Sequence, residues 1–296
     1  MNKKFSILIC VLSFFVLRSQ LPNTDVWLFK LEKTKTELKL TNPKNITNRT
    51  GYDNQPSFSN DSKKIYYVSI REDKQADIYF YDIKSEENHH FKKSKESEYS
   101  PTIAPDKKNL ACVVVREDSS QIIIPFGLED SEKTNYPNNK FREQQLSLID
   151  SVGYFTFLNS DTVLYYKLTQ PHSLNAYCIS TGKNSWLGNN PIRAFKTLNR
   201  HAFIYGIKDS VKVTFYKYDF VFHKAEKYAE YPSTSEDAIW HEQHGLIKSE
   251  ENKLLRYDEA KKEWLLLFDL SGFGIKKITR FTFDQKNKYL VVVDNL

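Results

Sequence analysis

The residues in this sequence that most resemble a metal-binding motif are His241-Glu242-Gln243-His244. The zinc motif HExxH needs histidines four residues apart, because that spacing brings both imidazoles to one face of a helix. Here the histidines are three apart, and the four residues lie at a predicted hairpin turn between strands. We therefore expect a surface turn, and we assign no metal and no cofactor to this sequence.

Motifs for covalent catalysis and for phosphate binding give no candidate either. The sequence contains no Gly-x-Ser-x-Gly, so no serine is placed in a nucleophile elbow. Its one Gly-x-Gly, Gly272-Phe273-Gly274, lacks the context of a phosphate-binding loop. The motif search yields no catalytic residue, which favours a binding protein over an enzyme and leaves the question of an activity open.

The candidate binding segment is Gly127–Leu146, the longest irregular stretch after the N-terminal region. It is rich in charged and amide side chains, and the aromatic residues Tyr136 and Phe141 stand among them, next to Arg142. Long loops on rigid scaffolds often carry binding residues. We therefore take Tyr136, Phe141 and Arg142 as candidate partner-binding residues; the simpler interpretation is a solvated loop.

The scaffold that would hold this loop is a repeated β-unit, most regular over Tyr52–Asp82. The turn Asn60-Asp61-Ser62-Lys63 leads into a strand at Lys64–Ser69, and a second strand at Asp77–Asp82 runs back. Both strands are rich in β-branched and aromatic residues and are bounded by Asn, Asp and Ser. This pattern is typical of a β-hairpin.

Six copies of this unit follow one another along the chain. Their turns fall 45, 55, 38, 44 and 42 residues apart, at Asp61, Asp106, Asp161, Asn199, Gln243 and Gln285. A period of roughly 40 to 45 residues with about four strands per unit is typical of a β-propeller, one blade per repeat. The sequence therefore predicts an all-β fold, a six-bladed β-propeller, in preference to an open sandwich of irregular strands.

The two ends of the chain are predicted to share one blade. The last copy, Arg280–Val293, lacks a third strand, and Thr24–Leu31 matches the third strand of the first copy, Ala76–Ile83, almost position by position. Pairing Thr24–Leu31 with Tyr289–Val293 would cover strand edges that otherwise promote aggregation. We therefore predict ring closure by the N-terminal strand.

In such a ring the innermost strands surround a central channel, at whose mouth six-bladed lactonases and sialidases have their sites. Five acidic residues precede predicted innermost strands: Asp53, Glu98, Asp150, Glu236 and Asp237. Gathered there they could bind a metal ion, although ordinary loop solvation explains them more simply. Arginines are few, and no cluster of three is visible to bind a sialic-acid carboxylate. A lactonase-like, metal-dependent hydrolase is the alternative to a binding protein, and a small-molecule or glycan binder is a further one.

Residues 1–19 have the pattern of a signal peptide. Lys3 and Lys4 precede the apolar run Phe5–Leu17, which is too short to span a bilayer, and Ser19 suits the position before cleavage. We expect residues 20–296 to form one six-bladed propeller domain with no membrane span, periplasmic or secreted, and monomeric. A retained N-terminal anchor is the alternative.

Charge and cysteine content narrow the choice of partner. Without the first 19 residues the chain carries 40 basic and 37 acidic side chains, interspersed, for a net charge near +3. So mild a charge gives no reason to expect a nucleic-acid partner.

The two cysteines outside the first 19 residues, Cys112 and Cys178, fall in strands of different units. Small buried side chains suit both positions, and whether the two form a disulfide stays open.

The two most regular repeats resemble those of a known family. Asn54–Tyr67 and Tyr99–Leu110 share a proline, an aspartate-containing turn, basic residues and an apolar strand. This pattern resembles the WD40-like β-propeller repeat of the periplasmic TolB family. Pro105-Asp106 keeps the family's turn, whereas Asn60 replaces the turn proline in the first copy, and the turn glycine is absent from both. The clear resemblance covers Gly51–Val115.

The resemblance implies an exported six-bladed propeller that binds other proteins. The chain leaves no room for the separate N-terminal domain of the family's best-known member, which puts a role in the Tol system itself in doubt. The repeat marks a fold rather than a site, so no functional residues carry over. The expected function is non-enzymatic binding of a protein partner in the cell envelope.

Overall fold

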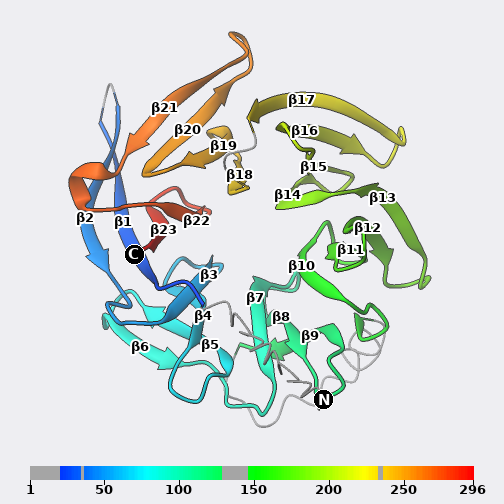
Figure 1. Ribbon diagram of the computed structural model, residues 1–296, viewed down its shortest axis with the longest axis horizontal. Helices are drawn as coiled ribbons and strands as arrows, with labels where there is room; N and C mark the ends of the chain where they lie inside the picture. The colour runs from blue at the N-terminus through cyan, green and yellow to red at the C-terminus, as the bar shows by residue number, and fades with distance from the viewer. Residues whose placement is uncertain (1–20, 35–36, 129–145, 233–235) are drawn as a thin grey trace, which may run out of the picture.

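The computed structural model describes residues 21–34, 37–128, 146–232 and 236–296 as six antiparallel sheets around one axis (Figure 1). Five sheets have four strands, and the other has three among the described residues. Each sheet is one blade, whose first strand lies nearest the axis (Figure 1). The six-bladed β-propeller that the repeat spacing predicts is therefore confirmed.

Blades 1 to 3 follow the chain order from the inner to the outer strand. Blade 1 comprises β3 (Tyr52–Phe58), β4 (Lys64–Ile70), β5 (Ala76–Asp82) and β6 (Glu87–His90). Blade 2 comprises β7 (Ser97–Ile103), β8 (Asn109–Val115) and β9 (Gln121–Gly127). Blade 3 comprises β10 (Val152–Phe157), β11 (Thr162–Lys167), β12 (Ser173–Cys178) and β13 (Asn184–Asn189).

Blades 4 and 5 are built in the same way, and blade 6 combines both ends of the chain. Blade 4 comprises β14 (Pro191–Asn199), β15 (Ala202–Lys208), β16 (Lys212–Asp219) and β17 (Lys224–Pro232). Blade 5 comprises β18 (Ala238–His241), β19 (Gly245–Glu250), β20 (Lys253–Asp258) and β21 (Glu263–Asp269), followed by the 3₁₀ helix η1 (Ser271–Phe273). Blade 6 comprises β22 (Ile278–Phe283), β23 (Tyr289–Asn295), β1 (Thr24–Lys33) and β2 (Leu38–Asn45).

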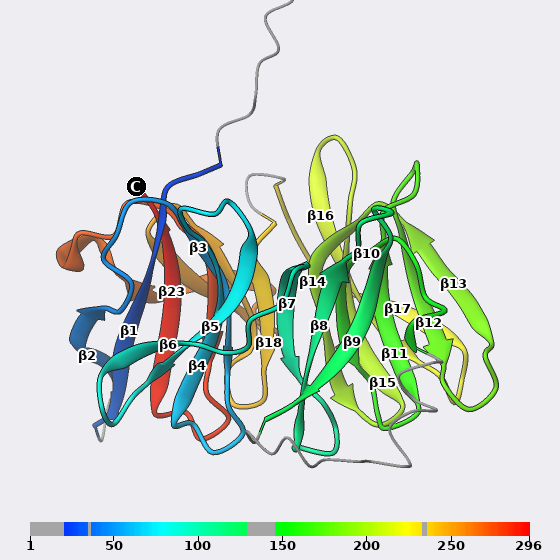
Figure 2. The same cartoon turned by 90° about the horizontal axis from the view of Figure 1, so that it is seen from below.

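Blade 6 contains the strand pairing that the sequence predicts between the chain ends. β1 runs antiparallel to β23, with a register from Thr24 opposite Asn295 to Lys30 opposite Tyr289. The two strands lie side by side near one edge of the molecule in Figure 2. On its other side β1 pairs with β2, so the N-terminal strand is hydrogen-bonded along both edges.

The second strand of each blade is largely buried, because neighbouring blades cover both of its faces. In β23 the four residues Leu290–Val293 are all fully buried. Outer strands are more exposed: β6 is a run of four polar residues, mostly exposed, whereas β21 is apolar in sequence but has only one buried residue. A polar, exposed strand such as β6 lacks the apolar alternation that reveals a strand in a sequence. The repeat pattern therefore locates up to three strands per blade and leaves out the fourth, outermost strand.

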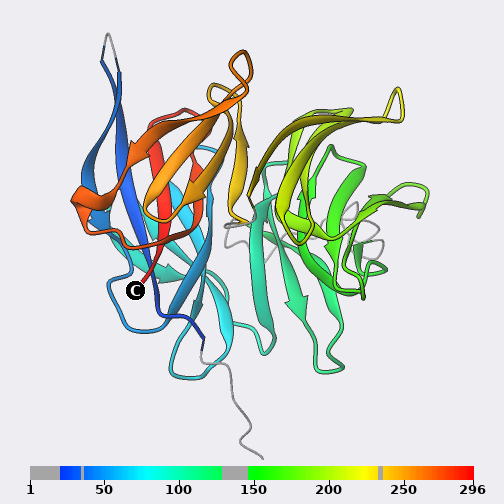
Figure 3. The same ribbon diagram turned by 45° about the horizontal axis from the view of Figure 1, so that its top comes forward.

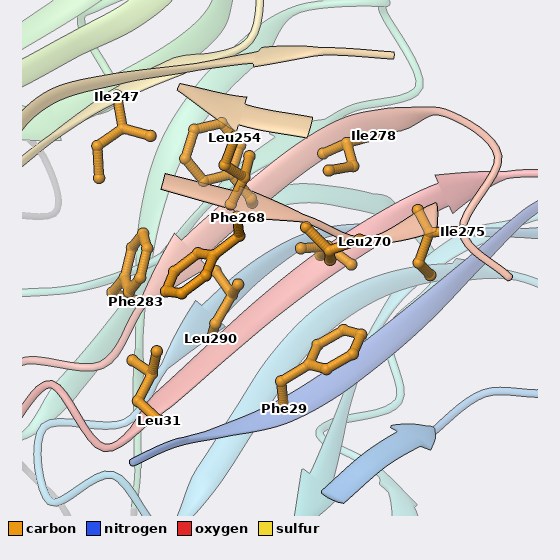
Figure 4. Packing of buried hydrophobic residues seen from close by; sticks show 12 residues of the cluster. Phe29, Leu31, Ile247, Leu254, Phe268, Leu270, Ile275, Ile278, Phe283 and Leu290 are labelled. Atoms are coloured by element: carbon orange, nitrogen blue, oxygen red, sulfur yellow. The ribbon is translucent and has the colours of Figure 1, made fainter. Parts of the chain in front are cut away.

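The core consists of clusters between adjacent blades rather than one central core. In the cluster of Figure 4, Phe29 of β1 and Leu290 of β23 pack near Leu254 and Phe268 of blade 5. Each blade thus buries its faces against two neighbours, and the sheets twist from the axis to the rim (Figure 3). Within the described residues no helix is long and apolar enough to cross a membrane.

Candidate functional site on the propeller axis

Five of the six inner strands carry irregularities in their pairing with the second strand of the blade. The register of the inner strand shifts in five blades, between Asn54 and Ser57, Tyr99 and Thr102, Val152 and Tyr154, Pro191 and Phe195, and Ile278 and Arg280. A β-bulge redirects side chains and interrupts pairing, and bulges are frequent next to functional sites. Here they surround the axis.

Two of the bulges contain a strained backbone position followed by proline. Gln55 and Ser100 have φ values of +55° and +54°, in the left-handed region, where non-glycine residues are uncommon. The two residues are joined, because the Ser100 backbone N–H donates to Gln55 Oε1 at 2.6 Å. This bond crosses from blade 1 to blade 2 and fixes the spacing of their inner strands.

A charged network links blades 4, 5 and 6 beside these bulges. Arg193 Nη2 donates to Asp237 Oδ1 at 2.7 Å, and Arg280 Nη1 lies 3.4 Å from the same oxygen. The Asp237 side chain is only 10 % exposed. Two guanidinium groups therefore share one carboxylate oxygen in a largely buried position.

Tyr154 of blade 3 extends the network across the axis. Arg280 Nη2 donates to the Tyr154 hydroxyl at 3.2 Å, and the Arg280 guanidinium carbon lies 5.1 Å from the centre of the Tyr154 ring. Burial alone would raise the pKa of Tyr154, but Arg280 and Arg193 outweigh it, and the pKa is lowered. Burial raises the pKa of Asp237, and the two arginines oppose that rise.

These side chains border a small hollow, which we call the axial hollow. It has a volume of about 180 Å³ and is lined by Gln55, Pro56, Ser100, Pro101, Thr102, Tyr154, Phe155, Arg193, Phe195, Arg280 and Phe281. The lining comes from the inner strands of five blades, and Asp237, which precedes the inner strand of blade 5, pairs with two of its residues. All six blades thus contribute to this site.

Only one of the five acidic residues considered from the sequence joins the axial hollow. Asp53 and Glu98 lie within β3 and β7 rather than before them, and both are buried. Asp150 accepts hydrogen bonds from backbone N–H groups, and Glu236 pairs with a lysine, Lys208, at 2.6 Å. Asp237 is the exception, and its partners are arginines.

The sequence around His241 forms the predicted turn. β18 ends at His241 and β19 begins at Gly245. The rings of His241 and His244 stack on each other, with centres 4.7 Å apart and planes inclined by 18°. Burial lowers the pKa of both histidines, for His241 to about 4. The expected turn is confirmed, and the side chains pack against each other instead of converging on a point.

The structure describes both cysteines, but it does not describe the candidate partner-binding residues or the signal segment. Cys112 is buried and Cys178 is half-buried, and both are free thiols. The candidate partner-binding residues Tyr136, Phe141 and Arg142 lie outside the described residues, as does the predicted signal segment, residues 1–19.

The residues of the charged network are spaced in the sequence by the repeat period. Arg193 and Asp237 are 44 residues apart, and Asp237 and Arg280 are 43 apart. Gln55 and Ser100 are separated by 45 residues. These separations equal the repeat period, so the residues occupy equivalent places in successive blades. Superposing the repeats in the sequence would have placed them in one layer around the axis.

Comparison with known proteins identifies the fold. No family model and no curated protein matches the sequence. Among solved structures, a putative TolB from Agrobacterium tumefaciens has a TM-score of 0.59 at 9 % identity, over 93 % of this chain and 99 % of that one. TolB from Acinetobacter baumannii has a TM-score of 0.53 at 13 % identity, over 92 % of this chain and 63 % of that one.

A third similar structure belongs to an enzyme. An oligogalacturonate lyase in complex with manganese has a TM-score of 0.54 at 10 % identity, over 88 % of this chain and 82 % of that chain. At these identities the likenesses show a shared fold alone. The TolB-like propeller fold predicted from Gly51–Val115 is confirmed for the whole ring.

Proposed function

We propose that this protein is a non-catalytic, TolB-like propeller that binds a partner protein in the cell envelope through the end of the propeller where the axial hollow lies. One observation carries the proposal. Tyr154, Arg193, Asp237 and Arg280 come from four different blades and meet at one place on the axis. A rigid ring that brings charged groups together in this way is suited to recognition.

The chemistry of these groups favours binding over acid–base catalysis. Arginine stays protonated at every physiological pH, and its planar group forms paired hydrogen bonds with carboxylates. Asp237, the carboxylate in this network, is engaged by both arginines and is therefore poorly placed to serve as a free base. The similarity to two TolB structures supports the propeller fold, and the resemblance of Gly51–Val115 to the TolB repeat is what suggests a protein partner.

The proposal includes an extracytoplasmic location. Residues 1–19 would act as a signal peptide and be removed, and residues 20–296 would fold as a monomeric propeller in the periplasm or outside the cell. The segment Gly127–Leu146, with Tyr136, Phe141 and Arg142, would add contacts to the same partner.

An enzyme is the second candidate, and the likeness to the oligogalacturonate lyase favours it. In that case the axial hollow would bind an anionic sugar, and a metal-dependent site would lie beside it. Incubation with oligogalacturonate and manganese separates the two candidates, because turnover above a buffer control supports the enzyme and contradicts the binding protein.

The direct test is affinity capture from an envelope extract of the source organism, with Gln20–Leu296 as bait. We expect one partner protein to be retained by the wild-type chain and lost from the Arg193→Gln/Arg280→Gln variant. The control is Lys261→Gln, which removes an exposed cation in the turn between β20 and β21, outside the hollow lining. Capture of no partner by the wild-type chain would overturn the proposal.

Loop replacement tests the contribution of the irregular segment. A second bait in which Gly127–Leu146 is replaced by a short turn should retain less of the same partner. Undiminished retention would remove Tyr136, Phe141 and Arg142 from the binding surface while leaving the axial site in place.

A further inference from the structure

We propose that the axial hollow binds the carboxylate of an acidic side chain presented by the partner protein, with Arg193 and Arg280 as its ligands. The inference rests on the proposed function and deepens it, because it names the chemical group that the partner must present.

The charged side chains at the hollow do not balance. Arg193 and Arg280 bring two positive charges to the hollow, and Asp237 supplies one negative charge, shared through a single oxygen at 2.7 Å and 3.4 Å. The neighbouring acid Glu236 is paired with Lys208 and does not change this balance. One positive charge is therefore left over at partly buried arginines, and an added anion would be favoured there.

Arg193 has a hydrogen-bond donor without a partner among the described residues. The Nε–H of Arg193 is buried and has no hydrogen-bond partner within the part of the chain that the structure describes. A buried donor without a partner is costly, and in native proteins it usually has a functional explanation. The Nε and Nη groups of arginine form the fork that binds both oxygens of a carboxylate. Arg193 Nη2 is engaged by Asp237, so the Nε–H is the donor of this guanidinium that a carboxylate entering the hollow could satisfy.

The volume of the axial hollow fits a single side chain. The hollow measures about 180 Å³, whereas pockets for whole small-molecule ligands usually measure about 300 to 1,000 Å³. Its volume is therefore matched to one short side chain better than to a whole small-molecule ligand. Pro56, Phe155 and Phe281 line it beside the arginines. These apolar walls suit the methylene groups of an acidic side chain whose carboxylate reaches the arginines.

The test is a titration of Gln20–Leu296 with two peptides that differ in one group. Acetyl-Gly-Gly-Glu-Gly-Gly-amide carries one side-chain carboxylate and no free terminus, and the matched peptide carries glutamine in its place. Calorimetry or chemical-shift titration at low ionic strength should show the glutamate peptide binding about tenfold more tightly, because charge-assisted bonds to arginine are lost in the other.

Two variants assign the effect to the hollow. Arg193→Gln/Arg280→Gln should weaken binding of the glutamate peptide about tenfold or more. The control Lys107→Gln/Lys108→Gln removes the same charge from another hollow, between blades 1 and 2, and should leave binding unchanged. Should the arginine variant fail to fold, single Arg280→Gln and competition by free glutarate in the wild-type chain give the same answer.

The outcomes are distinct from those that test the proposed function. Equal binding of both peptides, or equal binding by wild type and the arginine variants, overturns the carboxylate site. If the captured partner is also retained by the arginine variants, the carboxylate site fails while the protein-binding function stands. If glutarate binds tightly, the peptide binds weakly and no partner is captured, the site takes a free small carboxylate and the proposed partner class is wrong.

Discussion

Two arginine–aspartate networks in this propeller have similar composition and opposite character. At the junction of blades 6 and 1, Arg49 Nη1 donates to Asp53 Oδ2 at 2.9 Å, and Arg49 Nη2 donates to the Ile70 carbonyl at 2.9 Å. On the axis, Arg193 and Arg280 share one oxygen of Asp237. The first network pairs one cation with one anion, whereas the second has an excess cation.

The surroundings of the two networks differ as well. Asp53 is fully buried, and its backbone exchanges two hydrogen bonds with the Thr24 hydroxyl, which ties the N-terminal strand to blade 1. The Asp53 side chain has no exposed surface and lies inside the junction of blades 6 and 1. Arg193 is 30 % exposed and borders the axial hollow. A balanced, enclosed network stabilises the fold, whereas an unbalanced network beside a hollow is available to a ligand.

Removal of the strand that the first network holds should have the largest effect. Deletion of Gln20–Leu31 takes away most of β1, leaving β23 with an unpaired edge. We expect the ring to open and the protein to aggregate, because exposed strand edges pair with other chains. Light scattering and analytical size exclusion would show this, and a monomeric deletion variant of unchanged stability would contradict it.

Arg49→Ala should have the next largest effect, on stability and not on binding. It leaves Asp53 buried without its cation, which costs about 3 to 5 kcal/mol. Urea denaturation measures the loss, with Lys63→Ala as an exposed control that should leave the midpoint unchanged. A loss below about 1 kcal/mol, the size expected of a surface pair, would place this network in the same class as solvent-exposed ion pairs.

The pH dependence of the Arg49→Ala variant sharpens this prediction. Burial already raises the pKa of Asp53, with Ser69 and Arg49 opposing the rise, so removal of Arg49 raises it further. A carboxyl whose folded pKa lies above its unfolded value destabilises the fold as pH rises through that interval. The deficit of the variant relative to wild type should therefore shrink on acidification as Asp53 is protonated. A stability deficit that grows on acidification would contradict the raised pKa of Asp53 in the variant.

Arg280→Gln should give the reverse result: a smaller change in stability and a large change in binding. Asp237 keeps its closer partner Arg193 at 2.7 Å, and the repulsion between two guanidinium groups is relieved. The variant loses a long bond to Asp237 at 3.4 Å and a bond to the Tyr154 hydroxyl at 3.2 Å. We expect the free energy of unfolding to fall by less than about 3 kcal/mol, the size of two hydrogen bonds. A stability loss as large as that of Arg49→Ala would mean that both networks are structural.

The titration of Tyr154 gives the smallest but most local signal. Arg280 and Arg193 lower its pKa below the usual 10 despite its burial. The ultraviolet difference titration between wild type and Tyr154→Phe should therefore show a phenol that ionises below pH 10, and in an Arg280→Gln background it should ionise at higher pH. Tyr66, with a pKa raised by burial to about 12, is the matched control.

The lowered pKa of Tyr154 also affects how the free energy of unfolding depends on pH. The folded state binds this proton less tightly than the unfolded state, so the contribution of Tyr154 to stability increases as pH rises from its folded pKa toward 10. Loss of this increase in Arg280→Gln would agree with the titration, and its persistence would contradict the assigned cause.

The sequence predicted the fold better than the site, for physical reasons. Inner and middle strands repeat a hydrophobic pattern with turn residues at a fixed period, and these local signals were sufficient for six blades and for the pairing of β1 with β23. Outer strands such as β6 were missed because they are polar and exposed, whereas β21 was missed although it contains Trp264 and Leu265–Leu267. The axial network was missed because no short motif contains it: Arg193, Asp237 and Arg280 come together only through the ring.

The account as a whole depends on the difference between the two networks, and one measurement tests it most directly. Titration of folded Arg280→Gln with acetyl-Gly-Gly-Glu-Gly-Gly-amide, beside wild type and Arg49→Lys, reports the binding role of each. We predict about a tenfold loss of affinity for Arg280→Gln and wild-type affinity for Arg49→Lys. Equal affinity for all three proteins would contradict the assignment of the axial hollow as the binding site.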